Sequence, residues 1–258
     1  MKTILLASAA AALFAAPAFA QESVGSVGLG YAHTDTEGLK TDGATLDGVA
    51  AVKVAPEWTV TVNGSVAYAD SDFGDDTVGA AAAHLTKTFG SDLRAGAFAG
   101  VSDIGGENYF SVGGEVQKYL LSATLTGVVA YTDLDGADAW TFGGDAAYYV
   151  NPSLRLNAGV SYNNVDVDSV GEIDAWAYGV GAEYQLDNSP FSLFGSWQRV
   201  SLNDVDVDSD NFVVGARYNF GGTLQSLDRA GANLGRTLAG LPGPVSYTHL
   251  TLPTILRV

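Results

Sequence analysis

The fold class follows from residues 58–68, which read Trp58-Thr59-Val60-Thr61-Val62-Asn63-Gly64-Ser65-Val66-Ala67-Tyr68. Even positions in this stretch are apolar residues or glycine, whereas odd positions are Thr, Asn, Ser or Ala. Side chains of an extended chain point alternately to opposite faces, so a period of two indicates a strand with one apolar face. We therefore predict a β-strand here.

The same alternation recurs along the chain as short runs separated by turns. It predicts twelve strands, at 24–34, 44–54, 58–69, 78–89, 93–102, 109–119, 121–132, 140–150, 154–164, 175–186, 191–200 and 211–220. Short connections rich in turn residues, such as 151–153, alternate with longer acidic ones, such as 203–210. This arrangement predicts an all-β fold, a transmembrane antiparallel up-and-down β-barrel with short periplasmic turns and longer acidic external loops.

The alternative to a membrane barrel is a soluble β-sandwich or secreted barrel, and the two differ in which face is apolar. In 212–220 the even face carries Phe212, Tyr218 and Phe220, whereas the odd face carries Arg217 and Asn219. The side chains at odd positions are too small and polar to form a hydrophobic core. Large apolar side chains are therefore expected to face lipid, with small polar ones facing a watery lumen. Aromatic residues at strand ends also fit the girdles found at membrane interfaces.

The last predicted strand ends in Gly215-Ala216-Arg217-Tyr218-Asn219-Phe220. This segment resembles the C-terminal assembly signal of Gram-negative outer-membrane β-barrels, carried here by Gly215, Tyr218 and Phe220. The strand region as a whole resembles small porin-like members of that superfamily. The resemblance implies the outer membrane as location, and outer-membrane lipid and the barrel-assembly machinery as partners. Family members commonly end at this phenylalanine, but this chain continues, so the signal would have to act internally.

The two ends of the chain are expected to lie outside the barrel, which is assigned to residues 21–220. Residues 1–20 have the features of a signal peptide: Lys2, an apolar run, and a small-residue cleavage pattern that ends at Ala20. Residues 221–243 are expected to form a periplasmic C-terminal extension. Residues 244–258 are interpreted as an artefactual tail, because 244–254 resembles a translated sequencing-library adapter.

Composition excludes several functions. The 258 residues include 12 basic and 29 acidic side chains, for a net charge of −17, so nucleic acid is not an expected partner. There is no cysteine, which excludes a disulfide framework and thiolate metal sites. The run Asp204, Asp206, Asp208 and Asp210 superficially resembles a calcium loop. Ser209 replaces the required glycine and the final glutamate is missing, so these four are weak metal candidates and no cofactor is expected.

Strand parity places eight charged residues on the inward face, as candidate pore-lining residues: Asp47, Lys53, Arg94, Glu115, Asp145, Arg155, Glu183 and Arg217. Arg94 is expected near Glu115, and Asp145 near Arg155. Two interpretations stay open. The charges form either a constriction that selects solutes by size and sign, or a salt-bridged network that closes a narrow barrel.

We predict an outer-membrane porin-like channel for passive diffusion of small hydrophilic solutes, with a preference for cations because the external loops are acidic. The alternative is a non-conducting structural or adhesive barrel with a salt-bridged lumen. An outer-membrane enzyme comes third. No catalytic motif is found, and His33 and His84 are interpreted as interfacial residues, so the protein is not expected to be an enzyme.

Overall fold

The computed structural model describes residues 23–71, 74–104, 107–134, 136–167, 171–203 and 207–234. The predicted signal peptide, the predicted artefactual tail and the latter part of the C-terminal extension lie outside these residues, as do Asp204 and Asp206.

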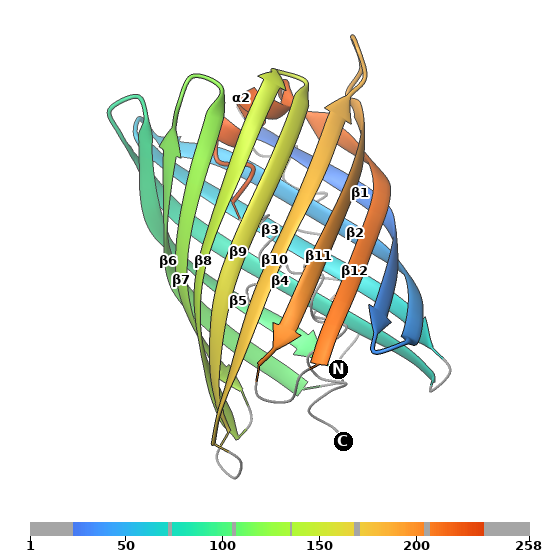
Figure 1. Cartoon of the computed structure of the whole chain (residues 1–258). Coiled ribbons are helices and arrows are strands. Elements are labelled where there is room, and N and C mark those ends of the chain that lie inside the picture. The colour runs from blue at the N-terminus through green and yellow to red at the C-terminus, as the bar shows by residue number, and fades with distance from the viewer. Residues whose placement is uncertain are drawn as a thin grey trace.

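The described residues form a closed barrel of twelve antiparallel strands (Figure 1). The strands are β1 (Ser23–Thr36), β2 (Leu39–Ala55), β3 (Trp58–Ser71), β4 (Gly74–Phe89), β5 (Leu93–Ile104), β6 (Glu107–Tyr119), β7 (Ala123–Leu134), β8 (Ala137–Asn151), β9 (Leu154–Val167), β10 (Gly171–Gln185), β11 (Phe191–Leu202) and β12 (Val207–Phe220). Each strand pairs with its neighbours in sequence, and β1 pairs with β12 to close the ring. The predicted fold class is confirmed.

The strands extend farther than predicted at the end away from the short turns. The segment 35–43 was expected to be mostly loop, yet β1 and β2 stay paired as far as Thr36 and Leu39. The connecting residues Glu37 and Gly38 both have positive φ, 51° and 86°. Such turns match the twist of the paired strands, so the ladder continues to the tip of the hairpin. Much of the acidic sequence that was predicted to form loops therefore lies in paired strands near the tips of hairpins.

The two faces of the sheet have the chemistry that the alternation predicted. On β10, Trp176 and Tyr178 are exposed on the outside, whereas the alternate residues Ala175 and Ala177 are buried on the inside. Large exposed apolar side chains occur on the outward face of every strand except β5, where small residues such as Ala97 and Ala99 take their place. A continuous apolar outer face over a small, polar inner face is the arrangement of a transmembrane β-barrel.

After β12 the chain turns back against the barrel wall. Gly221 and Gly222, with φ of 92° and 151°, make the reversal, and α2 (Leu224–Arg229) follows. Thr223 caps the helix by accepting a hydrogen bond from the Ser226 amide. Figure 1 shows α2 at the end of the barrel opposite the β1–β2 hairpin. No described helix is long and apolar enough to cross a membrane.

Two leucines attach this segment to the inner face of the wall. Leu224 packs against Ala147 and Tyr149 of β8, and Leu227 packs against Val49 and Ala51 of β2. The wall residues all have inward parity, so the described part of the expected periplasmic extension lies within the barrel end. Residues 221–234 are called the C-terminal segment below.

Candidate functional site: the charged lumen and the C-terminal segment

Arg217 of β12 lies at the centre of the largest charge network in the described lumen. Its Nη2 atom is 3.0 Å from Oδ1 of Asp47, and its Nη1 atom is 2.8 Å from Oε2 of Glu183. All three side chains are buried. Strand β1 separates Arg217 from Asp47, and both residues are in register with Gly28. A Cβ at Gly28 would lie 2.6 Å from Asp47 Oδ1, so glycine leaves the space for this pair.

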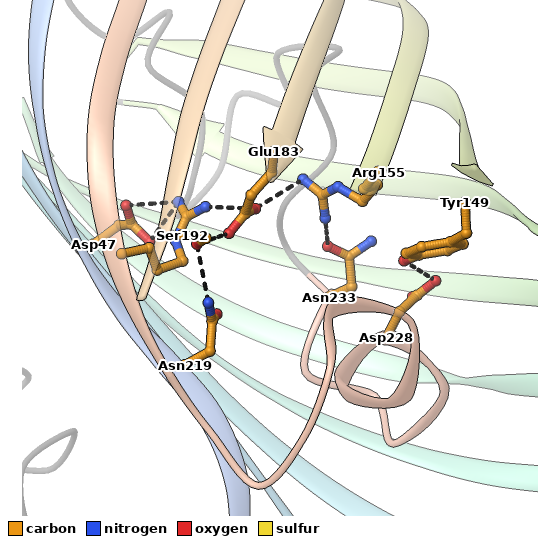
Figure 2. Close-up of polar contacts among 9 residues, drawn as sticks. Asp47, Tyr149, Arg155, Glu183, Ser192, Asn219, Asp228 and Asn233 are labelled. Atoms are coloured by element: carbon orange, nitrogen blue, oxygen red, sulfur yellow. Dashed lines mark hydrogen bonds and ion pairs between the residues drawn. The ribbon is translucent and has the colours of Figure 1, made fainter. Parts of the chain in front are cut away.

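Glu183 of β10 is shared between two arginines. Besides Arg217 it has Arg155 of β9 at 3.7 Å, and it accepts a hydrogen bond of 2.6 Å from Ser192 Oγ. Asn219 donates in turn to Ser192 at 2.9 Å (Figure 2). The network therefore runs from β2 to β9 along neighbouring strands. These strands are consecutive in the ring, so the network lies along one part of the barrel's circumference.

Gly215, one of the three residues of the predicted assembly signal, has a local role in this network. A Cβ at Gly215 would lie 2.6 Å from the Phe194 ring, so the inward ring of β11 packs over the glycine. The guanidinium of Arg217 lies 4.2 Å from the centre of the same ring, a cation–π contact. The outward residues of the signal are Tyr218, which is exposed, and Phe220, which is half-buried opposite Gly25.

A second buried cluster has His84 at its centre. His84 Nδ1 is 2.9 Å from Glu115 Oε1, and Nε2 is 2.9 Å from Asn63 Oδ1. All three side chains are buried on the inward face. The interpretation of His84 as an interfacial residue was therefore wrong. The cause is the run of alanines before it, which gives β4 no contrast between its faces.

The expected pair Arg94–Glu115 is wrong, because the hydrogen-bond partners of Arg94 within the described ranges are all neutral groups. It donates to Tyr119 Oη at 2.8 Å, to Thr86 Oγ1 at 2.9 Å and to the Arg229 carbonyl at 3.0 Å. The register explains the difference: Arg94 pairs with Gln117, so Glu115 lies two residues farther from the turn.

Arg155 interacts electrostatically with Asp145, as expected, and has two further partners. It lies directly opposite Glu183 in the β9–β10 register, whereas Asp145 lies opposite Gly159. Arg155 pairs with Glu183 and donates to Asn233 of the C-terminal segment at 2.6 Å. Asp145 is buried and inward. In Figure 2 Arg155 lies between the wall and the C-terminal segment.

Polar contacts complete the attachment of the C-terminal segment. Tyr149 donates to Asp228 at 2.7 Å, and Thr61 Oγ1 donates to the Gly231 carbonyl at 3.1 Å. Burial raises the pKa of the Asp228 carboxyl above its ordinary value. Leu234 is 1% exposed. These contacts were not predicted from the sequence, in which the leucine spacing at 224 and 227 was the available signal.

The remaining predicted residues lie at the two ends of the barrel. Lys53 is exposed at the short-turn end. At the opposite end, Asp208 and Asp210 are both paired with Arg199, at 3.6 Å and 2.5 Å. Across the ranges that the structure describes, no group of three His, Asp or Glu residues could hold a metal ion. The weak metal candidates therefore gain no support from the two that are described.

Comparison with known proteins gives likeness in structure alone. No protein-family model matches the sequence, and no curated protein matches it. Among solved structures, the KdgM porin in complex with disordered oligogalacturonate has a TM-score of 0.54 at 12% identity, covering 77% of this chain and 99% of that one. The NanC porin has a TM-score of 0.55 at 6% identity, covering 74% of this chain and 98% of that one. At these identities the likeness shows the fold, a closed antiparallel barrel of the outer-membrane type.

Proposed function

We propose that the protein is a channel in the outer membrane of a Gram-negative bacterium, through which small hydrophilic solutes diffuse passively. The observation that carries this proposal is the course of the charge network. Asp47, Arg217, Glu183 and Arg155 interact along neighbouring strands on one side of the wall. The ion pairs of this network join side chains along the wall and do not cross the lumen, which supports a pore-lining role. The likeness to two porins agrees with this function.

The acidic hairpins at the end away from the short turns would give this channel a preference for cations. In the part of that end that the structure describes, Asp35, Asp42, Asp138 and Asp174 contrast with few basic residues, and Arg199 there is already paired. A rim of one charge sign concentrates ions of the opposite sign. We assign no catalytic role.

The second candidate is a non-conducting barrel, and the C-terminal segment is the observation that favours it. Three leucines of this segment, Leu224, Leu227 and Leu234, are buried within the short-turn end. A segment held this firmly would narrow or close that end of the lumen.

Single-channel recording in planar bilayers tests the proposal, with the full chain and a variant that ends after Gly222. We expect conductance steps from the full chain and larger steps from the shortened one. Steps from the shortened chain alone would favour the non-conducting barrel. Complete insertion of both without steps would overturn a channel function. In a potassium chloride gradient the reversal potential should show cation preference that fades as salt screens the rim, and anion preference at low salt would contradict the role of the rim.

A further inference from the structure

A cavity of about 590 Å³ lies between the C-terminal segment and the barrel wall. On the wall side its lining includes Ala51, Lys53, Thr59, Thr88 and Arg94, which belong to strands β2 to β5. On the other side it is lined by Gly221, Arg229 and Ala230 of the C-terminal segment. Its volume is within the range of sites that bind small molecules.

The cavity collects positive charge that has no counter-ion among the residues that the structure describes. Lys53, Arg94 and Arg229 all line it, and none has a carboxylate within ion-pair distance among the described residues. Every other described lysine or arginine except Lys40 has such a partner. The chain has 29 acidic and 12 basic residues, so three basic residues around one cavity, none paired with a described carboxylate, run against its overall negative charge.

The bonds that these arginines do make are to neutral groups. Arg94 is 4% exposed and donates to two hydroxyls and a carbonyl. Arg229 donates to the carbonyls of Leu120 and Leu121, at 2.5 Å and 2.9 Å. The one acidic residue that lines the cavity, Glu57, is paired with Lys87 at 3.2 Å. A buried guanidinium without an anionic partner is costly, and an anion in the cavity would remove that cost.

The cavity is reached from the short-turn end. Two of its lining residues, Lys53 and Glu57, are exposed to solvent at that end. Thr59 and Thr88 point into the lumen, while their neighbours Trp58 and Phe89 are exposed on the outer face. The strands therefore separate the cavity from lipid. A periplasmic solute enters it without passing the acidic rim at the other end.

We propose that this cavity binds a small soluble anion with two or more carboxylate or phosphate groups, which joins Arg229 of the C-terminal segment to Lys53 and Arg94 of the wall. Guanidinium and ammonium groups suit such anions because they form charge-assisted hydrogen bonds. The bound anion would hold the C-terminal segment in place and lower the conductance of the pore. The lowered conductance and entry from the periplasm rest on the proposed channel function. The anion site itself does not.

Isothermal titration calorimetry with citrate tests the site, using the full chain folded in a neutral detergent without lipid at low salt. We expect binding of one citrate per chain. Lys53→Gln should weaken it about tenfold, since one charge-assisted contact is lost at an exposed position. Lys40→Gln is the matched control, because Lys40 also has no ion-pair partner among the described residues but lies at the opposite end. It should leave citrate affinity unchanged.

Several outcomes would overturn the proposal. These are the absence of citrate binding, equal weakening by both variants, and the loss of citrate binding when anionic phospholipid is added, which would assign the cations to a lipid headgroup. The calorimetry does not depend on conduction. Citrate binding without channel steps would preserve the site and remove the proposed function, whereas channel steps without citrate binding would do the reverse.

Discussion

Replacing Leu227 with alanine tests whether the C-terminal segment is held within the barrel by apolar packing. Leu227 is 5% exposed and packs against Val49, Ala51 and Ala232. Buried leucine-to-alanine changes cost about 2–5 kcal/mol. A lumen wall is partly hydrated, so we expect the lower part of this range, about 2–3 kcal/mol. At 1.4 kcal/mol per factor of ten, the ratio of undocked to docked segment should rise about 30- to 150-fold.

Trypsin cleavage after Arg229 measures this ratio. The bond lies at the end of α2, and the following Gly231 carbonyl is bound to Thr61, so the protease requires an undocked segment. When docking is faster than cleavage, the cleavage rate follows the undocked population. Mass spectrometry of the folded full chain should therefore show the rate rising by the same 30- to 150-fold.

Leu121→Ala is the matched control for this experiment. Leu121 is 90% exposed at the same end of the barrel, so the identical change removes no buried contact. It should alter cleavage after Arg229 by no more than about twofold. Equal cleavage rates in the wild type and in Leu227→Ala, with both barrels folded, would refute the packing argument.

Three further predictions concern assembly, stability and pH. Phe220→Asp places a charge at the outward end of β12, opposite Gly25, and should reduce the folded barrel found in outer-membrane fractions; unchanged levels would contradict a role in assembly. Arg217→Ala leaves Asp47 and Glu183 without their shared cation and should lower the free energy of unfolding in urea by up to about 3–5 kcal/mol. Arg199→Ala, at the acidic end of the barrel, should lower the free energy of unfolding by less than about 1 kcal/mol, because the Arg199 pairs are more exposed. Equal losses in the two variants would contradict this argument from burial. Because burial raises the pKa of Asp228, the neutral form favours docking, so docking is strongest below the ordinary carboxyl pKa and weakens as pH rises through the raised value. Conductance should therefore increase from acidic to neutral pH, and Asp228→Asn should remove this dependence; a variant that keeps it would assign the effect to another group.

The sequence by itself determined the strands and their faces. Alternation in an extended chain is a local property, because successive side chains point to opposite sides whatever the neighbouring strand is. Residues 58–68 therefore predicted both a strand and the inward position of Thr59, Thr61 and Asn63. Alternation predicts nothing where it is absent. The alanines of β4 gave no parity, and His84 was assigned to the wrong environment.

Only the tertiary structure decided which inward charges meet. Contacts across strands depend on the register of every pair and on the closure of β1 against β12, which no single strand encodes. Arg217 reaches Asp47 across β1 because Gly28 is level with both, whereas Arg94 and Glu115 are two residues out of register. The C-terminal segment lies within the barrel for the same reason. Leu227 is a short apolar signal in the sequence, and its binding surface on β2 exists only once the ring has closed.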